Sequence, residues 1–383
     1  MEKYQYIFAK QLIEIDRIEE NVYVEIENGY IKSISKELKK GLDITNVNIL
    51  APGLIDTHIH GNTGFDTMDG TYTSLNEMSK ELASYGVTAF CPTTLTAPLE
   101  KIQKALEAVA LAKEKGTQGA EILGAFIEGP YFNEKYKGAQ PDEFFRKANK
   151  TEIDEFIKWS NGHISTIAIA PEKEGSLETI DYIVKKGIRV ALGHTNSDYE
   201  TCMKAVELGA SVGVHTFNGM RGMHHREPGT VGAIFLEDRL YGELIGDGEH
   251  VHPQMIELMY RCKGVDKMIL ISDGMCATGM KDGNYKLGEL DVVVENSVAR
   301  TSYGSLAGST LKLINAVFNI EKWTSANLQQ SIQMASYTPA KSLKVDGEMG
   351  QIAVGKKANL IEIDNEQVMK TWVNGRLVFQ REA

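Results

Sequence analysis

The chain has 383 residues, of which 42% are hydrophobic and 24% are charged, and its formal net charge is −11. This length allows a large core in one or two domains, and the acidic balance argues against nucleic acid or an anionic membrane as the main partner. The four cysteines show no close Cys-x-x-Cys spacing, so we expect neither a thiolate metal site nor a disulfide framework. No apolar run is long enough to span a bilayer and the first residues lack the order of a signal peptide, so we expect a cytoplasmic protein.

Both ends of the chain carry short alternating patterns of apolar and polar residues that are typical of antiparallel strands. Each end also contains an Asn-Gly pair, Asn28-Gly29 and Asn374-Gly375, which is the strongest short signal for a hairpin turn. Chain ends often lie close together, so we expect residues 1–51 and 345–383 to form one small β-sandwich domain. Residues 52–344 are then inserted as a second domain. The predicted strands of the small domain cover residues 4–8, 22–26, 30–34, 359–363, 368–373 and 376–379.

The middle of the chain alternates short apolar runs with helical patterns. Such runs are typical of buried parallel strands, and eight strand–helix units predict a closed (β/α)8 barrel of the TIM type, in the α/β class. An open doubly wound sheet is the main alternative, but the glycine-rich dinucleotide loop of that fold is absent from the sequence. Residues 281–303 predict a β-hairpin inserted after the last strand, which could act as a flap. The eight runs cover residues 54–60, 87–91, 122–128, 165–170, 190–194, 212–215, 240–245 and 268–273.

Five of the eight runs end in a residue that can bind a metal ion or carry a proton. In His58-Ile59-His60 the two imidazoles are two residues apart, and on a strand such positions point to the same side. Taken singly, a strand-end histidine is more often a hydrogen-bonded core residue, and an Asp after a strand often caps a helix. Barrel active sites lie at the C-terminal ends of the strands, so together these residues predict a site for one or two divalent metal ions. The candidate ligands are His58, His60, Glu128, His194, His215 and Asp273.

Several longer motifs accompany these residues over nearly the whole chain, among them Glu-Gly-Pro at 128–130, His-x-x-Asn-x-Met at 215–220 and Ser-Leu-Ala-Gly-Ser at 305–309. On these motifs the sequence resembles the amidohydrolase superfamily and, more narrowly, its N-acetylglucosamine-6-phosphate deacetylase family. The combination of Glu-Gly-Pro, His-x-x-Asn-x-Met and Ser-Leu-Ala-Gly-Ser is much more specific than any His-x-His pair. The matching segments are residues 52–61, 128–133, 193–195, 215–220, 246–250, 272–274 and 305–309.

The resemblance implies a role for each candidate residue. Glu128, His194 and His215 are expected to hold the main catalytic metal, and His58 and His60 make a second metal plausible. Asp273 matches the catalytic acid/base and contributes to the metal site. Imidazole and carboxylate ligands suit Zn, Fe, Mn and Co alike, so the ligands do not select one of them.

The resemblance also implies a substrate site for a sugar phosphate. Arg226 is expected on the phosphate, and because the family can supply such a residue from a neighbouring subunit, a homodimer is expected. Some members have a histidine where this chain has Gln140, and a glutamine donates a hydrogen bond but cannot carry a proton. The expected substrate contacts are Ala139, Gln140, Asn218, Gly219, Arg226, His250, Leu306, Ala307 and Gly308.

The activity that this resemblance implies is hydrolysis of N-acetylglucosamine 6-phosphate to glucosamine 6-phosphate and acetate. A bound divalent ion would lower the pKa of its water from about 15.7 toward about 7. Asp273 would take a proton from this water as it attacks the amide carbon, and would then return the proton to the leaving nitrogen. Two alternatives stay open: another amidohydrolase reaction on a cyclic amide, dipeptide or base, and a catalytically silent barrel that serves as a binding module. The Glu-Gly-Pro and Ser-Leu-Ala-Gly-Ser segments argue against the first, and the presence of all six candidate ligands argues against the second.

Overall fold

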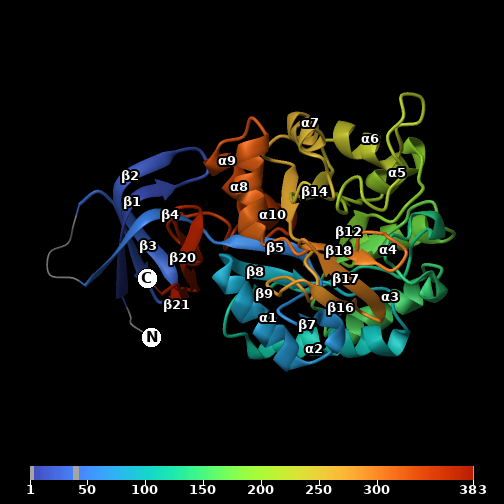
Figure 1. Cartoon of the computed structure of the whole chain (residues 1–383), viewed down its shortest axis with the longest axis horizontal. Coiled ribbons are helices and arrows are strands. Elements are labelled where there is room, and N and C mark those ends of the chain that lie inside the picture. Colours follow the sequence, from blue (N-terminus) through green and yellow to red (C-terminus); the bar gives the residue numbers. More distant parts are fainter. Residues whose placement is uncertain (1–3, 38–42, 383) are drawn as a thin grey trace.

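The structure is a computed structural model that describes residues 4–37 and 43–382. Strands from both ends of the chain form one seven-stranded sheet at one end of the molecule, beside a larger α/β part (Figure 1). The strand order is β21-β20-β19-β4-β1-β2-β3, so the sequence-distant ends share one sheet. Its strands are β1 (Tyr4–Ile13), β2 (Ile18–Glu27), β3 (Tyr30–Ser35), β4 (Ile44–Pro52), β19 (Leu360–Asp364), β20 (Gln367–Val373) and β21 (Arg376–Gln380).

The two Asn-Gly turns adopt the backbone that their sequence predicts. Asn28 and Gly29 have φ of 52° and 87°, and Asn374 and Gly375 have φ of 50° and 70°, as a type I′ hairpin turn requires. One pairing differs from the antiparallel prediction, because β1 and β4 run parallel. β4 does not form a hairpin with β3 but lies between β1 and β19.

The larger part contains a parallel six-stranded sheet that curls into a half-barrel, in the order β10 to β15. A second parallel sheet, β5-β8-β9, lies beside it. All eight predicted runs form strands, although the run at 212–215 shortens to two residues because His215 leaves the strand with φ of 25°. The strands are β5 (Leu54–Ile59), β8 (Val87–Pro92), β9 (Glu121–Ile122), β10 (Ala125–Ile127), β11 (Ile164–Ile169), β12 (Arg189–Leu192), β13 (Val212–Gly213), β14 (Tyr241–Ile245) and β15 (Met268–Ile271).

Single parallel bridges connect the two sheets at both of their borders. Thr93, just after β8, pairs with Phe126 in β10, and Ile59 in β5 pairs with Gly274, just after β15. The Asp273 amide also donates to the His58 carbonyl at 2.9 Å. The ends of β5 and β15 therefore lie next to each other, although they are more than 200 residues apart in the sequence.

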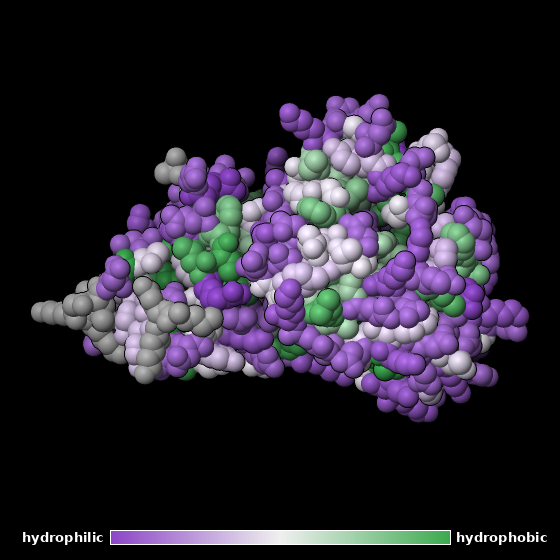
Figure 2. Space-filling view, turned by 90° about the horizontal axis from the view of Figure 1, so that it is seen from below, coloured by the Kyte–Doolittle hydropathy of each residue, from purple (hydrophilic) through white to green (hydrophobic). Residues whose placement is uncertain are grey.

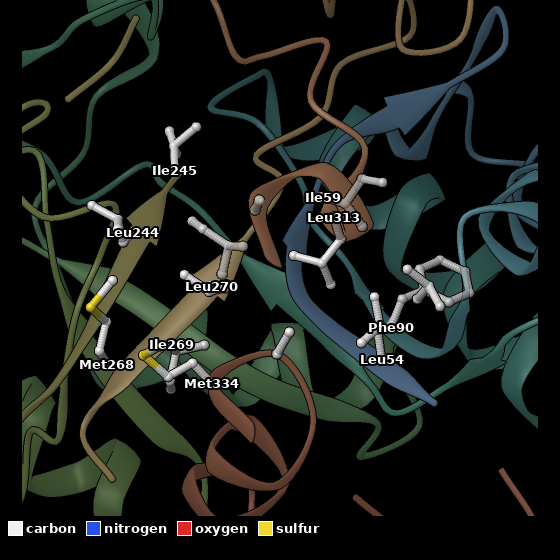
Figure 3. Close-up of a cluster of buried hydrophobic side chains, with 14 of the residues drawn as sticks. Leu54, Ile59, Phe90, Leu244, Ile245, Met268, Ile269, Leu270, Leu313 and Met334 are labelled. Atoms are coloured by element: carbon white, nitrogen blue, oxygen red, sulfur yellow. The ribbon is translucent and has the colours of Figure 1, made fainter. Parts of the chain in front are cut away.

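Helices cover the outside of these strands, and an apolar layer fills the space between them (Figure 1). Figure 3 shows part of this layer, where Leu54, Phe90, Leu270 and Leu313 come from β5, β8, β15 and the helix α8. Strands buried on both faces read as continuous apolar runs, which explains why the runs were recognisable in the sequence. The helices are α1 (Tyr72–Ser84), α2 (Leu99–Lys115), α3 (Lys150–Trp159), α4 (Ser176–Lys185), α5 (Tyr199–Glu207), α6 (Gly229–Leu236), α7 (Pro253–Lys263), α8 (Leu313–Trp323), α9 (Leu328–Met334) and α10 (Tyr337–Ser342).

The predicted hairpin after the last barrel strand is a small sheet of three antiparallel strands. It comprises β16 (Gly283–Leu287), β17 (Leu290–Glu295) and β18 (Val298–Thr301). Its inner residues, among them Leu287 and Val292, pack on Met275 and Ala307 in the segments that follow β15 and β18. Short elements complete the chain: β6 (Gly61–Asn62), β7 (Phe65–Asp66) and the 3-10 turns at Thr67–Asp69, Glu134–Tyr136 and Asp142–Phe144.

Across residues 4–37 and 43–382 no helix combines the length and the apolar character that crossing a bilayer requires. The face drawn in Figure 2 is mostly hydrophilic, and its apolar patches are small and separated.

Candidate metal centre and active site

The structure brings all six predicted ligands together at the C-terminal ends of the strands. His58 ends β5 with Ile59, Glu128 follows β10, and His194, His215 and Asp273 each lie two residues beyond their strands. None of the six side chains belongs to a residue that is more than 7% exposed. They form two groups in which the potential ligand atoms lie within 4.8 Å of one another: Glu128 with His194 and His215, and Asp273 with His58 and His60.

The first group has a geometry that suits a cation. The Glu128 Oε1 atom lies 3.3 Å from His194 Nε2 and 3.1 Å from His215 Nε2, and the two Nε2 atoms are 3.2 Å apart. The Nδ1 atom of each ring faces a backbone carbonyl at 3.0 Å, that of Tyr136 for His194 and that of Asn218 for His215. A carbonyl only accepts, so each Nδ1 must carry the proton, and a neutral ring then presents a lone pair at Nε2. Two lone pairs and a carboxylate that face one another need a positive charge between them, and a divalent ion fits that need.

The second group adjoins the first through Glu128. Asp273 Oδ1 lies 3.4 Å from His58 Nε2 and 3.3 Å from His60 Nε2. Glu128 Oε2 is 3.3 Å from His60 Nε2, while its Oε1 faces the first group. The carboxylate of Glu128 therefore lies between the two groups, as expected for a residue that bridges two ions.

An unusual backbone conformation orients three of these side chains toward the cluster. His194, His215 and Asp273 have φ of 44°, 25° and 48°, in or near the left-handed region that most residues avoid. Such turns end the strands abruptly and point the side chains inward across the end of the sheet. Gly219 has φ of 59°, and a Cβ at this position would lie only 2.8 Å from His194 Nδ1. A glycine is thus required where the chain passes close to that ring.

The electrostatics of the cluster keep its carboxylates ionised. Burial raises the pKa of Glu128, but the positive charge of His58 and the hydrogen bonds from the other histidines outweigh burial and hold the pKa well below its usual range. Burial likewise raises the pKa of Asp273, and the charges of His58 and His60 lower it below its ordinary value. In the opposite direction, burial lowers the pKa of His215 and Glu128 raises it to about 9. Without a metal, protons would therefore occupy the positions between these groups.

A cavity opens above the two groups and contains most of the predicted substrate contacts. Ala139, Gln140, Asn218, Gly219, His250, Leu306 and Gly308 line it together with His60, Glu128, His194, His215 and Asp273.

Two predicted contacts do not line the cavity of this chain. Ala307 is fully buried against the three-stranded insertion. Its neighbours in the sequence, Leu306 and Gly308, line the cavity instead. The Arg226 side chain is exposed, and its Nη1 atom lies 2.7 Å from His225 Nε2.

The sequence did not predict four other lining residues, Leu95, Gly138, Leu287 and Ser305. Leu287 belongs to the insertion that was expected to act as a flap. That expectation is the feature of the sequence that could have indicated a cavity-lining role for Leu287.

Gln140 is fixed on both sides of its amide. Its Nε2 atom donates to Glu128 Oε2 at 2.7 Å, and its Oε1 atom accepts from the Thr96 amide at 3.0 Å. Because the backbone amide can only donate, the orientation of the side-chain amide is determined. The glutamine thus directs an N–H group toward the carboxylate that lies between the two groups.

The sequence reasoning also missed Glu243, a fully buried carboxylate in β14 that lies 3.2 Å from His58 Nδ1. The signal for it was a single acidic residue within the apolar run at 240–245.

Comparisons with known proteins agree with this architecture. The model of the amidohydrolase family matches residues 49–378. The N-acetylglucosamine-6-phosphate deacetylase of Vibrio furnissii is 50% identical over 86% of this chain and 83% of its own length. The N-acetylgalactosamine-6-phosphate deacetylase of Escherichia coli is 40% identical over 92% of this chain and 94% of its own length.

Solved structures show the same relationship. A variant of the N-acetyl-D-glucosamine-6-phosphate deacetylase of Mycobacterium smegmatis, in complex with N-acetyl-D-glucosamine-6-phosphate, superposes with a TM-score of 0.93. It is 27% identical, and the match covers 98% of this chain and 99% of that one. The N-acetylglucosamine-6-phosphate deacetylase of Thermotoga maritima, 33% identical, gives a TM-score of 0.90 over 98% of this chain and 100% of its own. The chain therefore belongs to the amidohydrolase family.

Proposed function

We propose that this protein removes the acetyl group from N-acetylglucosamine 6-phosphate and yields glucosamine 6-phosphate and acetate. The observation that carries the proposal is the convergence of Glu128, His194 and His215 on the floor of a cavity, with the two Nε2 atoms 3.3 Å and 3.1 Å from the same Glu128 oxygen. The 50% identity to the deacetylase of Vibrio furnissii supports the choice of reaction and substrate.

The larger part of the chain, residues 52–344, is proposed to be a (β/α)8 barrel of the TIM type. The parallel bridges at both borders between β5-β8-β9 and the six-stranded half-barrel support closure. Residues 1–51 and 345–383 are proposed to form a small β-sandwich domain, of which residues 1–3, 38–42 and 383 lie outside the described part. Backbone hydrogen bonds connect Ile31 and Gly29 to residues 355–358. Residues from both chain ends share one hydrophobic core beside the seven-stranded sheet, which supports the proposal.

One or two divalent ions per subunit are proposed as the cofactor, held by Glu128, His194 and His215 and by His58, His60 and Asp273. Zn, Fe, Mn and Co all suit these ligands. When bound, such an ion polarises the amide carbonyl and makes water a nucleophile at neutral pH. The chain's own contribution is to hold the ligands in one tautomer and to exclude bulk solvent from them.

Asp273 is the proposed acid/base. As the new C–O bond forms at the amide carbon, its ionised carboxylate takes a proton from the attacking water. It returns this proton to the nitrogen as the C–N bond breaks, because an amide nitrogen leaves only when it is protonated. The Gln140 N–H group, which points to the Glu128 carboxylate, is proposed to donate to the substrate at the position where some family members have a histidine.

The remaining cavity residues are proposed to bind the sugar and its phosphate. Asn218, Gly219 and His250 lie on one side, with Leu306 and Gly308 beside the insertion. Asp247 accepts from His250 Nδ1 at 2.6 Å, which orients the opposite ring nitrogen. Burial raises the pKa of Asp247, but the hydrogen bond from His250 outweighs burial and lowers it, so the carboxylate stays ionised and accepts this hydrogen bond.

Arg226 is proposed to reach the phosphate in the cavity of a second subunit, so the active form is a homodimer. Its exposed position outside the cavity of its own chain supports this proposal. Arg226→Ala is expected to raise KM for the phosphorylated sugar about 10–100-fold, the loss of a charge-assisted hydrogen bond, and to leave KM for the plain sugar unchanged. Arg239→Ala, another exposed arginine that pairs with Glu237, is the control. The cytoplasmic location stays a prediction.

The test is acetate release from purified enzyme with N-acetylglucosamine 6-phosphate, plain N-acetylglucosamine and N-acetylgalactosamine 6-phosphate. We expect the first substrate to give the highest kcat/KM and the plain sugar the lowest. N-acetylgalactosamine 6-phosphate is the second candidate, because the enzyme of Escherichia coli with that substrate in its name is 40% identical. Ammonia release, or no release from any of the three sugars, would contradict the proposal.

A further inference from the structure

Glu243 is the one acidic residue inside the apolar run that forms β14, and its exposed fraction is 0%. A buried carboxylate is costly unless polar or charged groups satisfy it. Its Oε2 atom lies 3.2 Å from His58 Nδ1, and its Oε1 atom accepts from Thr57 Oγ1 at 3.3 Å. Both partners belong to β5, so this side chain reaches across the interior of the barrel to the strand that carries the His-x-His pair.

The contact fixes which nitrogen of His58 carries the proton. A carboxylate accepts, so His58 Nδ1 donates to Glu243, and in the neutral ring that binds a metal the lone pair lies at Nε2. That Nε2 atom is buried and has no hydrogen-bond partner among residues 4–37 and 43–382. It lies 3.4 Å from Asp273 Oδ1 and 3.5 Å from Glu128 Oε1, both atoms of ionised carboxylates. An unpartnered lone pair between two anionic oxygens is the arrangement that a cation completes.

We propose that Glu243 is a positioning residue that holds His58 in its metal-binding tautomer and orientation. This inference rests on the proposed function, since it assumes that His58, His60 and Asp273 bind a divalent ion. Glu243 lies on the Nδ1 side of His58, opposite the Nε2 atom that faces the cluster, and therefore acts through the imidazole. Outer partners of this kind typically change metal affinity about 10–100-fold when they are removed.

A buried cation supplies the opposite charge for Glu243. Arg189 Nη2 lies 4.0 Å from Glu243 Oε1, and the Arg189 side chain is 7% exposed. Its other nitrogens donate to Thr166 Oγ1 at 2.9 Å and to Ser342 Oγ at 2.7 Å, so the guanidinium is held in place from β11 and α10. The line Arg189–Glu243–His58 thus runs from the barrel interior to the metal cluster and keeps a negative charge behind the imidazole.

The other histidines of the cluster show that this role is specific to His58. His194 and His215 direct Nδ1 to backbone carbonyls, and His60 Nδ1 has no hydrogen-bond partner in the described part of the chain. Only for His58, among the four predicted histidine ligands, does a side chain set the tautomer. Replacing Glu243 should therefore weaken the group that contains His58 and leave the group of Glu128, His194 and His215 intact.

The test measures zinc affinity of metal-stripped wild type and Glu243→Gln by equilibrium dialysis against buffered free zinc, followed by elemental analysis. His58→Asn identifies the binding step that belongs to this group. We expect Glu243→Gln to weaken that step about 10–100-fold and to leave the other step within threefold, because a neutral amide cannot replace the charge and can donate to Nδ1 in the wrong tautomer. Glu362→Gln, which removes another buried carboxylate paired with Lys370 in the small sheet, should change neither step.

Each other outcome overturns one specific statement. Unchanged affinity in Glu243→Gln, or an equal loss at both steps, contradicts the positioning role and favours a structural ion pair with Arg189. If Glu243→Gln does not fold, Thr57→Val removes the second hydrogen bond to the same carboxylate, and the absence of any weakening at the His58 step contradicts the inference. A wild type that binds no zinc instead contradicts the proposed metal site, while acetate release tests the proposed reaction independently.

Discussion

The two ligand groups present the same chemical atoms but are built in different ways. His194 and His215 lie on turns with positive φ, and backbone carbonyls anchor their rings. His58 lies within the strand β5, and a side-chain carboxylate anchors its ring. Backbone conformation and backbone carbonyls therefore fix the geometry of the first group, and few side-chain substitutions can change it. The geometry of the second group depends on one side chain, which makes its affinity easier to change by mutation.

Asp273→Asn should give the largest effect, because it removes the proposed acid/base without changing the shape of either group. We expect kcat to fall about 10²–10⁴-fold, the usual contribution of general acid–base catalysis. Zinc at the group of Glu128, His194 and His215 should remain bound. Steady-state acetate release and metal analysis of the same preparation measure both effects, and near wild-type kcat would contradict the assigned role.

Gly219→Ala should break the backbone-anchored group. The added Cβ meets His194 Nδ1 at 2.8 Å, and φ of 59° adds about 1–2 kcal/mol of strain for a residue with a side chain. We expect zinc affinity at this group to fall about tenfold, since 1.4 kcal/mol corresponds to that factor, while the group with His58 is retained. Gly222→Ala is the control, because a Cβ there meets nothing within 4 Å. Equal zinc affinity in both variants would argue against a steric requirement at Gly219.

Metal removal should make stability depend on pH. In the metal-free protein burial lowers the pKa of His215, but Glu128 raises it to about 9, above the value near 6.5 in an unfolded chain. The stabilisation from this raised pKa is complete below about pH 6.5 and is lost as the pH rises through about 9. The Tm of chelator-treated protein should therefore fall over this window, and zinc should restore it most at the high end. A flat Tm profile, or the same fall in His215→Asn, would count against this coupling.

Asn218→Ala should have the smallest effect on zinc affinity, and it tests the difference between anchoring by a backbone carbonyl and anchoring by a side chain. His215 Nδ1 is held by the backbone carbonyl of Asn218, which alanine also provides. Zinc affinity should stay within threefold of wild type, whereas KM for the sugar phosphate should rise because the cavity loses a polar side chain. A loss of zinc comparable to that expected for Glu243→Gln would remove the distinction between the two anchors.

The sequence singled out the six residues that the structure brings together because each lies at or just beyond the end of a buried strand, and burial on both faces leaves an apolar run that ends visibly at a polar residue. Their role as metal ligands stays a prediction. It did not predict Glu243, because a single acid within a strand does not reveal the distant partners that satisfy it. The shortened β13 and the parallel β1–β4 pair were also missed. Both depend on contacts between segments that are far apart in the chain. Arg226 stays a prediction, since one subunit alone leaves it outside the cavity.

The most direct measurement is metal reconstitution of stripped enzyme with acetate release as the readout. Increments of zinc are added while bound ion per chain and turnover of N-acetylglucosamine 6-phosphate are recorded together. We expect no turnover at the start and a rise that follows filling of the group formed by Glu128, His194 and His215. Full acetate release from protein without bound metal, or zinc binding that His194→Asn and His215→Asn leave unchanged, would contradict the account.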